Sequence, residues 1–410
     1  MKEKASSISR RNFFKTLGAL GVGAMAAPLE VRAADKTIAK NSNPSVVPQR
    51  PFGKTGHNVS ILSLGGMFDT RNNQILLRQA VKWGVTYWDT ATYYNSWGSE
   101  EGFGKYLAKY PQDRKKIFLV SKSPSKKVSK MSQYLDDSLK FLKTDYLDLY
   151  FVHAVNYVED ELNDDTRKWA EKTKKDGKIK LFGFSTHSNM ADNLFRASKL
   201  DWIDGIMTTY NFRVMHEPKM KTAIEACYKA GIGLTAMKTQ ASTTQVDTGQ
   251  ETDASKQLIA RSIKKGFTEE QARLVAVWKD QRIASICSQM PSMTLLKANV
   301  EAATNGDLLS KTDTELLQEH SKSTAHSYCA GCKSICEMTI HNQAPIGDVM
   351  RYLMYVRAYK ESRWAKEEFE RIPDAVREKM ARIDYTEAEK ACPNRLAIGK
   401  LMRTSLIELA

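Results

Sequence analysis

Short apolar runs alternate with helical patterns along most of the chain. The runs lie at Ile61–Leu64, Tyr87–Asp89, Ile117–Ser121, Leu147–His153, Leu181–Ser185, Ile206–Tyr210, Gly233–Met237 and Ala284–Ser288. Between them, residues repeat at helical spacing in Gln74–Trp83, Met131–Leu142, Arg167–Asp176, Lys219–Ala230 and Glu269–Asp280. Strands that alternate with helices favour parallel β-α units, so eight units predict an α/β fold, a (β/α)8 TIM barrel, over residues 48–305.

One long polar break interrupts this alternation, at Lys238–Gly266 after the seventh run. Loops at that end of a barrel carry functional sites, so a lid over the site is one interpretation. An unstructured surface insertion is the other.

Residues 1–33 have the layout of an export signal. The basic motif Arg10-Arg11-Asn12-Phe13-Phe14-Lys15 precedes a mostly apolar run, Leu17–Leu29. A run of about 13 residues is too short for a bilayer that needs about 20, so we expect no permanent membrane span. The paired arginines resemble a twin-arginine signal, which implies recognition by the twin-arginine export machinery; an ordinary secretory signal is the alternative. We therefore expect a periplasmic or otherwise exported protein, soluble after cleavage, with a linker at 34–47.

The formal net charge of +15 first suggests a nucleic-acid or membrane-surface partner. Part of it belongs to the signal, and the densest basic stretches, Lys172–Lys180 and Lys264-Lys265, contain no interleaved aromatic residues. We therefore expect no nucleic-acid partner. The charge leaves open weak attraction to an acidic redox partner or to membrane headgroups.

Four residues with acid–base chemistry follow the predicted strands. Asp89, Lys122 and His153 stand at three successive strand ends, and Tyr94 follows in the loop after Asp89. The carboxyl ends of barrel strands meet at one rim, so these side chains should converge. A nearby ammonium should lower the phenol pKa, the carboxylate should hold the ammonium, and the histidine should orient a carbonyl oxygen or assist proton delivery.

The motifs around these residues resemble the aldo/keto reductase family across roughly residues 48–305. The match rests on Asp89-Thr90-Ala91-Thr92-Tyr93-Tyr94, Ser99-Glu100-Glu101, Val120-Ser121-Lys122, Asp145–Tyr150, His153, Gly183-Phe184-Ser185, Tyr210-Asn211 and Asn299. The resemblance implies NADP(H) as hydride donor, Tyr94 as general acid, and Asp89, Lys122 and His153 as the rest of a catalytic tetrad. It also implies a small-molecule carbonyl or alcohol substrate.

The cofactor half of the family pattern is less complete. Ser185, Met237 and Asn299 stand at positions that contact the cofactor in the family. Thr186 and Met207, however, replace the Asn and Gln that hold the nicotinamide carboxamide, and Met237 replaces an aromatic residue. A thioether cannot both donate and accept hydrogen bonds as an amide does.

Four cysteines near the C-terminus have ligand spacing: Cys329, Cys332, Cys336 and, with a following proline, Cys392. Three thiolates from one loop and a fourth from a distance would suit a [4Fe–4S] cluster or an all-cysteine zinc site. In an exported chain, the four cysteines could instead form two disulfides, which is the third interpretation. The segment resembles the ferredoxin-like module found in a branch of aldo/keto reductases, which favours the cluster.

The sequence thus predicts a barrel at 48–305 followed by a mostly helical four-cysteine module at 306–410. The function it favours is an exported oxidoreductase that reduces a carbonyl or oxidises an alcohol. The alternative is a non-catalytic, ligand-binding barrel with a structural metal or disulfide site.

Overall fold

Eight parallel strands close into a barrel in the computed structural model, which describes residues 46–241, 252–305, 309–359 and 362–410. The strands are β3 (Leu62–Gly65), β4 (Tyr87–Asp89), β5 (Phe118–Ser123), β6 (Leu147–Val152), β7 (Ile179–Thr186), β8 (Gly205–Thr209), β9 (Gly233–Met237) and β10 (Ser285–Gln289). Strand β10 pairs with both β3 and β9, which closes the ring. The predicted barrel is confirmed. The expected signal at 1–33 and most of the expected linker lie outside the described residues.

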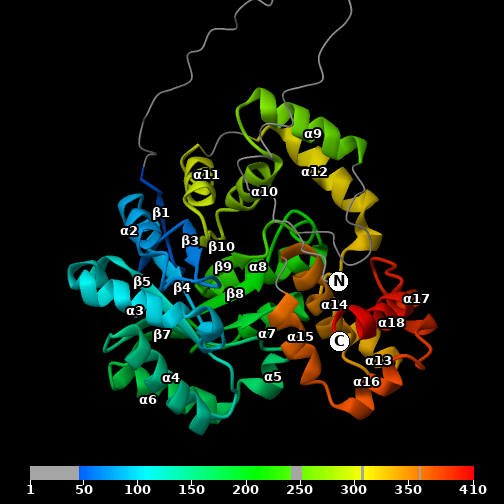
Figure 1. Ribbon diagram of the computed structural model, residues 1–410, viewed down its shortest axis with the longest axis horizontal. Helices are drawn as coiled ribbons and strands as arrows, with labels where there is room; N and C mark the ends of the chain where they lie inside the picture. The colour runs from blue at the N-terminus through cyan, green and yellow to red at the C-terminus, as the bar shows by residue number, and fades with distance from the viewer. Residues whose placement is uncertain (1–45, 242–251, 306–308, 360–361) are drawn as a thin grey trace, which may run out of the picture. The chain divides into compact units, whose positions relative to one another are not determined.

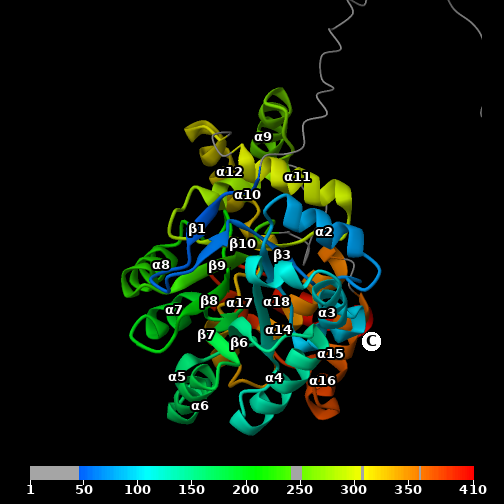
Figure 2. The same ribbon diagram turned by 90° about the vertical axis from the view of Figure 1, so that its left-hand side faces the viewer.

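Helices cover the outside of the barrel (Figures 1 and 2). They are α2 (Gln74–Lys82), α3 (Ser99–Lys109), α4 (Val128–Leu142), α5 (Val158–Glu161), α6 (Asp164–Lys175), α7 (Met190–Ala197), α8 (Pro218–Ala230), α10 (Glu269–Trp278) and α11 (Met293–Thr304), with 3-10 turns η1 (Thr92–Trp97) and η2 (Pro111–Lys116). Helix α10 begins at a capping box, in which Thr268 and Gln271 bond each other's backbone N–H groups. No helix in the described ranges is long and apolar enough to cross a membrane.

The polar break after β9 is not wholly loop. Residues Asp253–Lys264 form helix α9, which begins where the Thr252 side chain accepts a hydrogen bond from the backbone N–H of Ser255. Ala254 and Leu258, one helical turn apart, are buried. Helix α9 packs beside α12 (Lys311–Ser323), and both lie at the top of Figure 1. The sequence pattern did not predict this helix because the segment is mostly polar and its apolar face is narrow.

A hairpin closes the N-terminal end of the barrel. Strands β1 (Gln49–Pro51) and β2 (Asn58–Ser60) pair antiparallel, and Phe52 from their turn is fully buried. Its ring fills the space beside Gly205 and Gly233, where a Cβ would clash with it at 2.9 and 2.4 Å. Side chains therefore fill the barrel at the N-terminal ends of its strands, and the C-terminal ends are where barrel enzymes place their active sites.

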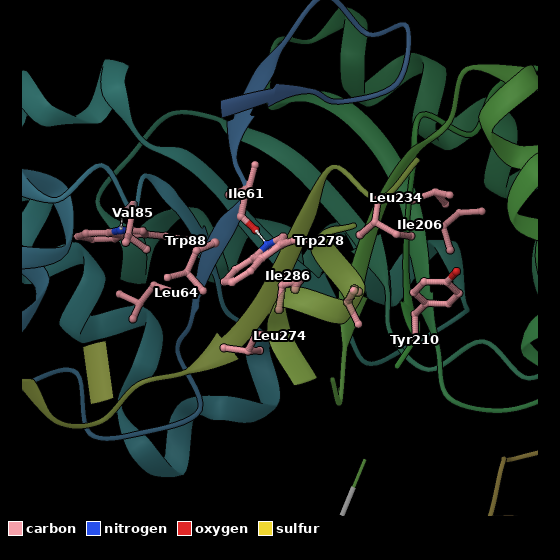
Figure 3. Close-up of a cluster of buried hydrophobic side chains, with 14 of the residues drawn as sticks. Ile61, Leu64, Val85, Trp88, Ile206, Tyr210, Leu234, Leu274, Trp278 and Ile286 are labelled. Atoms are coloured by element: carbon pink, nitrogen blue, oxygen red, sulfur yellow. Dashed lines mark hydrogen bonds between the residues drawn. The ribbon is translucent and has the colours of Figure 1, made fainter. Parts of the chain in front are cut away.

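A second layer of apolar side chains joins the strands to the surrounding helices. Figure 3 shows part of it, with Trp88 and Trp278 among its largest members. The indole N–H of Trp278 donates to the backbone oxygen of Ile61 at 2.8 Å, which satisfies its polar atom inside the core.

The C-terminal helices have a core of their own, built from apolar residues between Cys336 and Leu409. They are α13 (Lys333–Thr339), α14 (Ile346–Met354), the π-helical turn η4 (Tyr355–Tyr359), α15 (Ser362–Glu370), α16 (Asp374–Met380), α17 (Thr386–Ala391) and α18 (Ile398–Glu408), the orange and red elements of Figure 1. We call residues 329–410 the cysteine module.

Two helix pairs in the cysteine module repeat one contact. The Glu337 carboxylate of α13 accepts from the backbone N–H of Gly347 at 2.9 Å. The Glu389 carboxylate of α17 accepts in the same way from Gly399 at 2.8 Å. Each glutamate thereby satisfies an N–H in the first turn of the following helix, so α13–α14 and α17–α18 are equivalent units.

Candidate active site

The alternation of side chains along each strand places the candidate residues at the barrel mouth. On β5, Phe118 and Val120 point into the interior cluster, and Lys122 is next on the same face. On β4, Tyr87 precedes Asp89 in the same way. His153 directly follows β6, on the face of Leu149 and Phe151. Asp89 and Lys122 are thus the last inward-facing residues of their strands, and His153 continues the inward face of β6.

Lys122 and Asp89 form a buried ion pair. The Lys122 Nζ donates to Asp89 Oδ1 and Oδ2, both at 2.7 Å, and to the backbone oxygen of Thr90 at 2.8 Å. The side chains are 1% and 3% exposed. Burial raises the pKa of the Asp89 carboxyl against the opposing pull of Lys122. All three donors of the ammonium are occupied, so its position is fixed.

Tyr94, in η1, lies beside this pair. The Lys122 Nζ is 5.3 Å from the centroid of its ring. Burial raises the pKa of Tyr94 well above its usual value, and the charge of Asp89 raises it further. The expected lowering of this pKa by Lys122 is therefore wrong, because the ammonium is neutralised by Asp89 and the site excludes water. The phenol stays protonated over the working pH range.

His153 completes the group of four. Its ring lies 6.1 Å from that of Tyr94, centroid to centroid, at an interplanar angle of 83°. Burial lowers the pKa of His153 well below its usual value, and Lys122, Lys126, Arg351 and Lys238 lower it further. The imidazole is therefore neutral and offers one N–H donor.

Tyr93 also approaches His153, with ring centroids 6.1 Å apart. Its side chain is exposed, and Arg371 of the cysteine module lies over the ring at 5.5 Å. Tyr94, with Lys122 against its ring, is the tyrosine that belongs to the group of four at the barrel mouth.

A model described as "Aldo/keto reductase family" matches residues 62–302, more than half of the chain. The chain belongs to the aldo/keto reductase family. It is an oxidoreductase, as are its named relatives. "Uncharacterized oxidoreductase YqkF" of Bacillus subtilis is 25% identical over 305 residues, which cover 67% of this chain and 96% of that protein. "Methylglyoxal reductase DkgA" of Escherichia coli is 30% identical over 122 residues, which cover 29% of this chain and 38% of that protein.

Solved structures share the barrel of this aldo/keto reductase. The thermostable aldo-keto reductase Tm1743, in complex with the inhibitor epalrestat, has a TM-score of 0.56 and 24% identity, with 67% of this chain and 99% of that chain covered. The holo form of AKR11C1 from Bacillus halodurans has a TM-score of 0.55 and 23% identity, with 67% and 96% covered. These likenesses support the fold.

Aldo/keto reductases typically use NADP(H), but the nicotinamide-binding positions here do not fit the family's usual contacts. The hydroxyl of Thr186 lies 2.8 Å from the backbone oxygens of Val155 and Ser188, and is fully buried. Met207 is 2% exposed inside the barrel. Neither offers the donor and acceptor of an amide to a carboxamide.

The remaining cofactor candidates are engaged within the protein. The Ser185 hydroxyl accepts from the backbone N–H of Ala154 at 3.0 Å. Met237 packs against the interior cluster. The Asn299 amide donates to the Ser288 hydroxyl at 3.0 Å.

Near Asn299, where a phosphate would approach, the first turn of α11 exposes Met293 and Leu295, each 39% exposed. The Nζ of Lys297 lies 3.7 Å from a carboxylate oxygen of Glu301 on the exposed side of this helix.

The four cysteines line one small apolar cavity, with Ile346, Met350 and Leu396 among its walls. All six cysteines of the chain lie in the described ranges, and none forms a disulfide. Burial, together with the charges of neighbouring groups, raises the pKa of Cys332 to about 11 and that of Cys336 to about 12.

No group of three or more His, Cys, Asp or Glu side chains in the described ranges has the geometry to hold a metal ion. A zinc ion would need its sulfurs about 2.3 Å away, all at one point. A [4Fe–4S] cluster takes each thiolate on a different iron, so its sulfurs stand farther apart.

The mouth contains polar residues that the sequence did not single out. His187 and Lys238 directly follow β7 and β9, and Arg351 and Tyr355 enter from α14 and η4. The strand-end rule that found His153 would also have found His187 and Lys238. Nothing in the local sequence places Arg351 and Tyr355 here.

Proposed function

We propose that this aldo/keto reductase reduces a small carbonyl compound, or oxidises the corresponding alcohol, with Tyr94 as the proton-transfer residue. The observation that carries the proposal is the buried Lys122–Asp89 pair against the ring of Tyr94. Such a pair is costly to bury and contributes little stability by itself, which favours a functional role for it.

The four side chains divide the work of moving one proton. Asp89 fixes Lys122, and Lys122 holds the ring of Tyr94 in place. The neutral imidazole of His153 donates to the carbonyl oxygen of the substrate and orients it. Reduction also needs a two-electron donor that would deliver a hydride to the carbonyl carbon. As the carbonyl oxygen then gained alkoxide character, it would become a much stronger base than a phenolate, so the proton would pass from Tyr94 despite its raised pKa. In the reverse direction, the hydroxyl of the alcohol substrate gives its proton to the phenol oxygen of Tyr94.

The test is Tyr94→Phe, with Tyr93→Phe as the matched control. Loss of a general acid typically costs about 10²–10⁴-fold in kcat, with a smaller change in KM. Tyr93→Phe removes a hydroxyl from the neighbouring residue and should retain turnover within a few-fold. Equal rates in wild type and Tyr94→Phe would rule out the assigned role.

We also propose that Cys329, Cys332, Cys336 and Cys392 hold a [4Fe–4S] cluster. Four thiols around one apolar cavity support the proposal. When bound, such a cluster transfers single electrons or ties the chain together. These residues would supply the four thiolates, and their burial would keep water from the cluster.

Export by the twin-arginine machinery remains a proposal that rests on Arg10-Arg11 and the apolar run after them. Export of a folded chain is consistent with a cofactor inserted beforehand. Arg10→Lys together with Arg11→Lys should trap the protein in the cytoplasm when cells are fractionated. A periplasmic level equal to that of the wild type would contradict this route.

A further inference from the structure

Lys238 is a cation at the barrel mouth that lacks a carboxylate partner among the described residues. Its Nζ donates to the phenol oxygen of Tyr355 at 2.9 Å and lies over the rings of Tyr355 and Tyr359, at 4.2 and 5.6 Å. Burial lowers the pKa of Lys238, and Arg351 lowers it further. A phenol and two aromatic faces compensate an ammonium far less than an anion would.

Lys238 lines a small cavity of about 30 Å³ together with His187 and Arg351. A space of this size holds one or two water molecules, or the head of a carboxylate. Two of the residues that line it each contain a buried polar atom with no hydrogen-bond partner in the described structure, His187 Nδ1 and Arg351 Nε. The donors here outnumber the acceptors.

The charges around the mouth confirm this imbalance. Asp89 is paired with Lys122, and Glu161 lies 3.4 Å from Lys126. Asp348 is shared between Arg351, at 3.0 Å, and Lys333, at 3.2 Å. No described carboxylate balances the charge of Lys238, and this charge lowers the pKa of both His153 and His187.

We infer that Lys238, Arg351 and His187 form a binding site for an oxyanion, a carboxylate or phosphate group, on the molecule that reacts at Tyr94. The inference rests on the proposed function for the position of that reaction, and adds the chemical class of its ligand. Lys238 supplies the charge, Arg351 a guanidinium fork, and His187 a neutral donor. Because Arg351 comes from α14, the cysteine module contributes directly to the site of the barrel.

The first test is anion-dependent stability of the full chain, measured by thermal unfolding. Oxalate or inorganic phosphate, at about 50 mM and at ionic strength matched with chloride, should raise the Tm of the wild type. Lys238→Met should abolish that rise, and should itself unfold at the same or higher temperature in chloride because it removes a partly buried charge that no described carboxylate balances. Lys126→Met is the matched control: it removes the same charge from the same rim, but Lys126 is paired with Glu161 and does not line the cavity.

The second test compares binding of an acid with that of its methyl ester by calorimetry. Two pairs sample two distances between the anion and the carbonyl: pyruvate with methyl pyruvate, and 4-carboxybenzaldehyde with methyl 4-formylbenzoate. At least one acid should bind the wild type about tenfold or more tightly than its ester, and Lys238→Met should remove that preference. The inference is overturned if no anion stabilises the wild type, or if Lys126→Met and Lys238→Met behave alike.

Titration with NADPH distinguishes the source of the oxyanion. If NADPH displaces oxalate and loses affinity in Lys238→Met, the group is a dinucleotide phosphate; if it does neither, the group belongs to the substrate. Tyr94→Phe separates this inference from the proposed function. That variant should bind oxalate as the wild type does, whether or not it retains turnover.

Discussion

The Nζ of Lys122 donates to both carboxylate oxygens of Asp89 at 2.7 Å, at the end of two adjacent strands of the barrel. Neither side chain is appreciably exposed. Removal of one partner would leave the other charge buried and unpaired, which is destabilising. The pair therefore matters for the stability of the barrel mouth as well as for the proposed proton transfer.

Lys122→Met should destabilise the protein by about 3–5 kcal/mol near neutral pH. The loss should shrink as the pH falls, because the unpaired Asp89, whose pKa burial already raises, then becomes neutral. Urea unfolding at several pH values measures this. Lys122→Met combined with Asp89→Leu should be more stable than Lys122→Met alone, and an additive loss in the double variant would contradict the pairing.

His320 should make the stability of the protein sensitive to acid. Burial, together with the charges of Arg213 and Arg273, lowers its pKa to about 4. Between pH 6.5 and 4 the unfolded chain binds a proton at this residue and the folded chain does not, so stability falls as the pH falls. In this range the wild type should lose about 1.4 kcal/mol more per pH unit than His320→Gln, whose amide retains a partner in Thr252. Parallel stability curves for the two proteins would show that His320 is protonated in the folded state.

Iron content should follow the four cysteines of the cavity and no others. Wild type purified without oxygen should be brown and contain about four irons per chain. Cys332→Ser should lose colour and most of the iron. Cys227→Ser should keep both, because Cys227 is buried in α8 and its thiol bonds the Leu194 oxygen at 3.1 Å, which a hydroxyl can also do. About one zinc per chain would instead indicate a zinc site, and oxidised thiols without metal would indicate disulfides.

Gly183 should not tolerate a side chain. A Cβ there would lie 1.8 Å from the backbone oxygen of Gly205 on the neighbouring strand. Gly183→Ala should therefore destabilise the barrel by about 3 kcal/mol or more, measured by urea unfolding. Gly177→Ala is the control: its φ is +76° but no atom lies within 4 Å of the added carbon, so its cost should be about 1 kcal/mol. Equal losses would mean that the strands separate to accommodate the methyl group.

The barrel could be predicted from the sequence because each strand and helix leaves a local signature. The alternation of side chains along β5 that points Phe118 and Val120 into the barrel also points Lys122 toward its mouth. Once the ends of the strands are known, the positions of most candidate residues follow. The same reasoning failed for α9, whose two buried apolar residues, Ala254 and Leu258, are a weaker signal than its many polar ones.

The electrostatics of the mouth could not be predicted in the same way. The sequence places Lys122 near Tyr94, but the pKa of that phenol depends on burial and on Tyr355, which is far along the chain. The surplus charge of Lys238 likewise becomes visible only when every carboxylate around it is found to have another partner. Contacts between distant segments set both properties.

Tyr328, the residue before the first cysteine of the cavity, is bonded at both ends. Its hydroxyl accepts from the Asn211 amide at 3.1 Å, just beyond β8, and its backbone oxygen accepts from the Asn394 amide at 2.7 Å, two residues after Cys392. One rigid ring thus spans from the barrel rim to the loop that carries the fourth cysteine. Through Tyr328, the loop that carries Cys392 and the barrel rim beyond β8 are therefore linked by two hydrogen bonds in series.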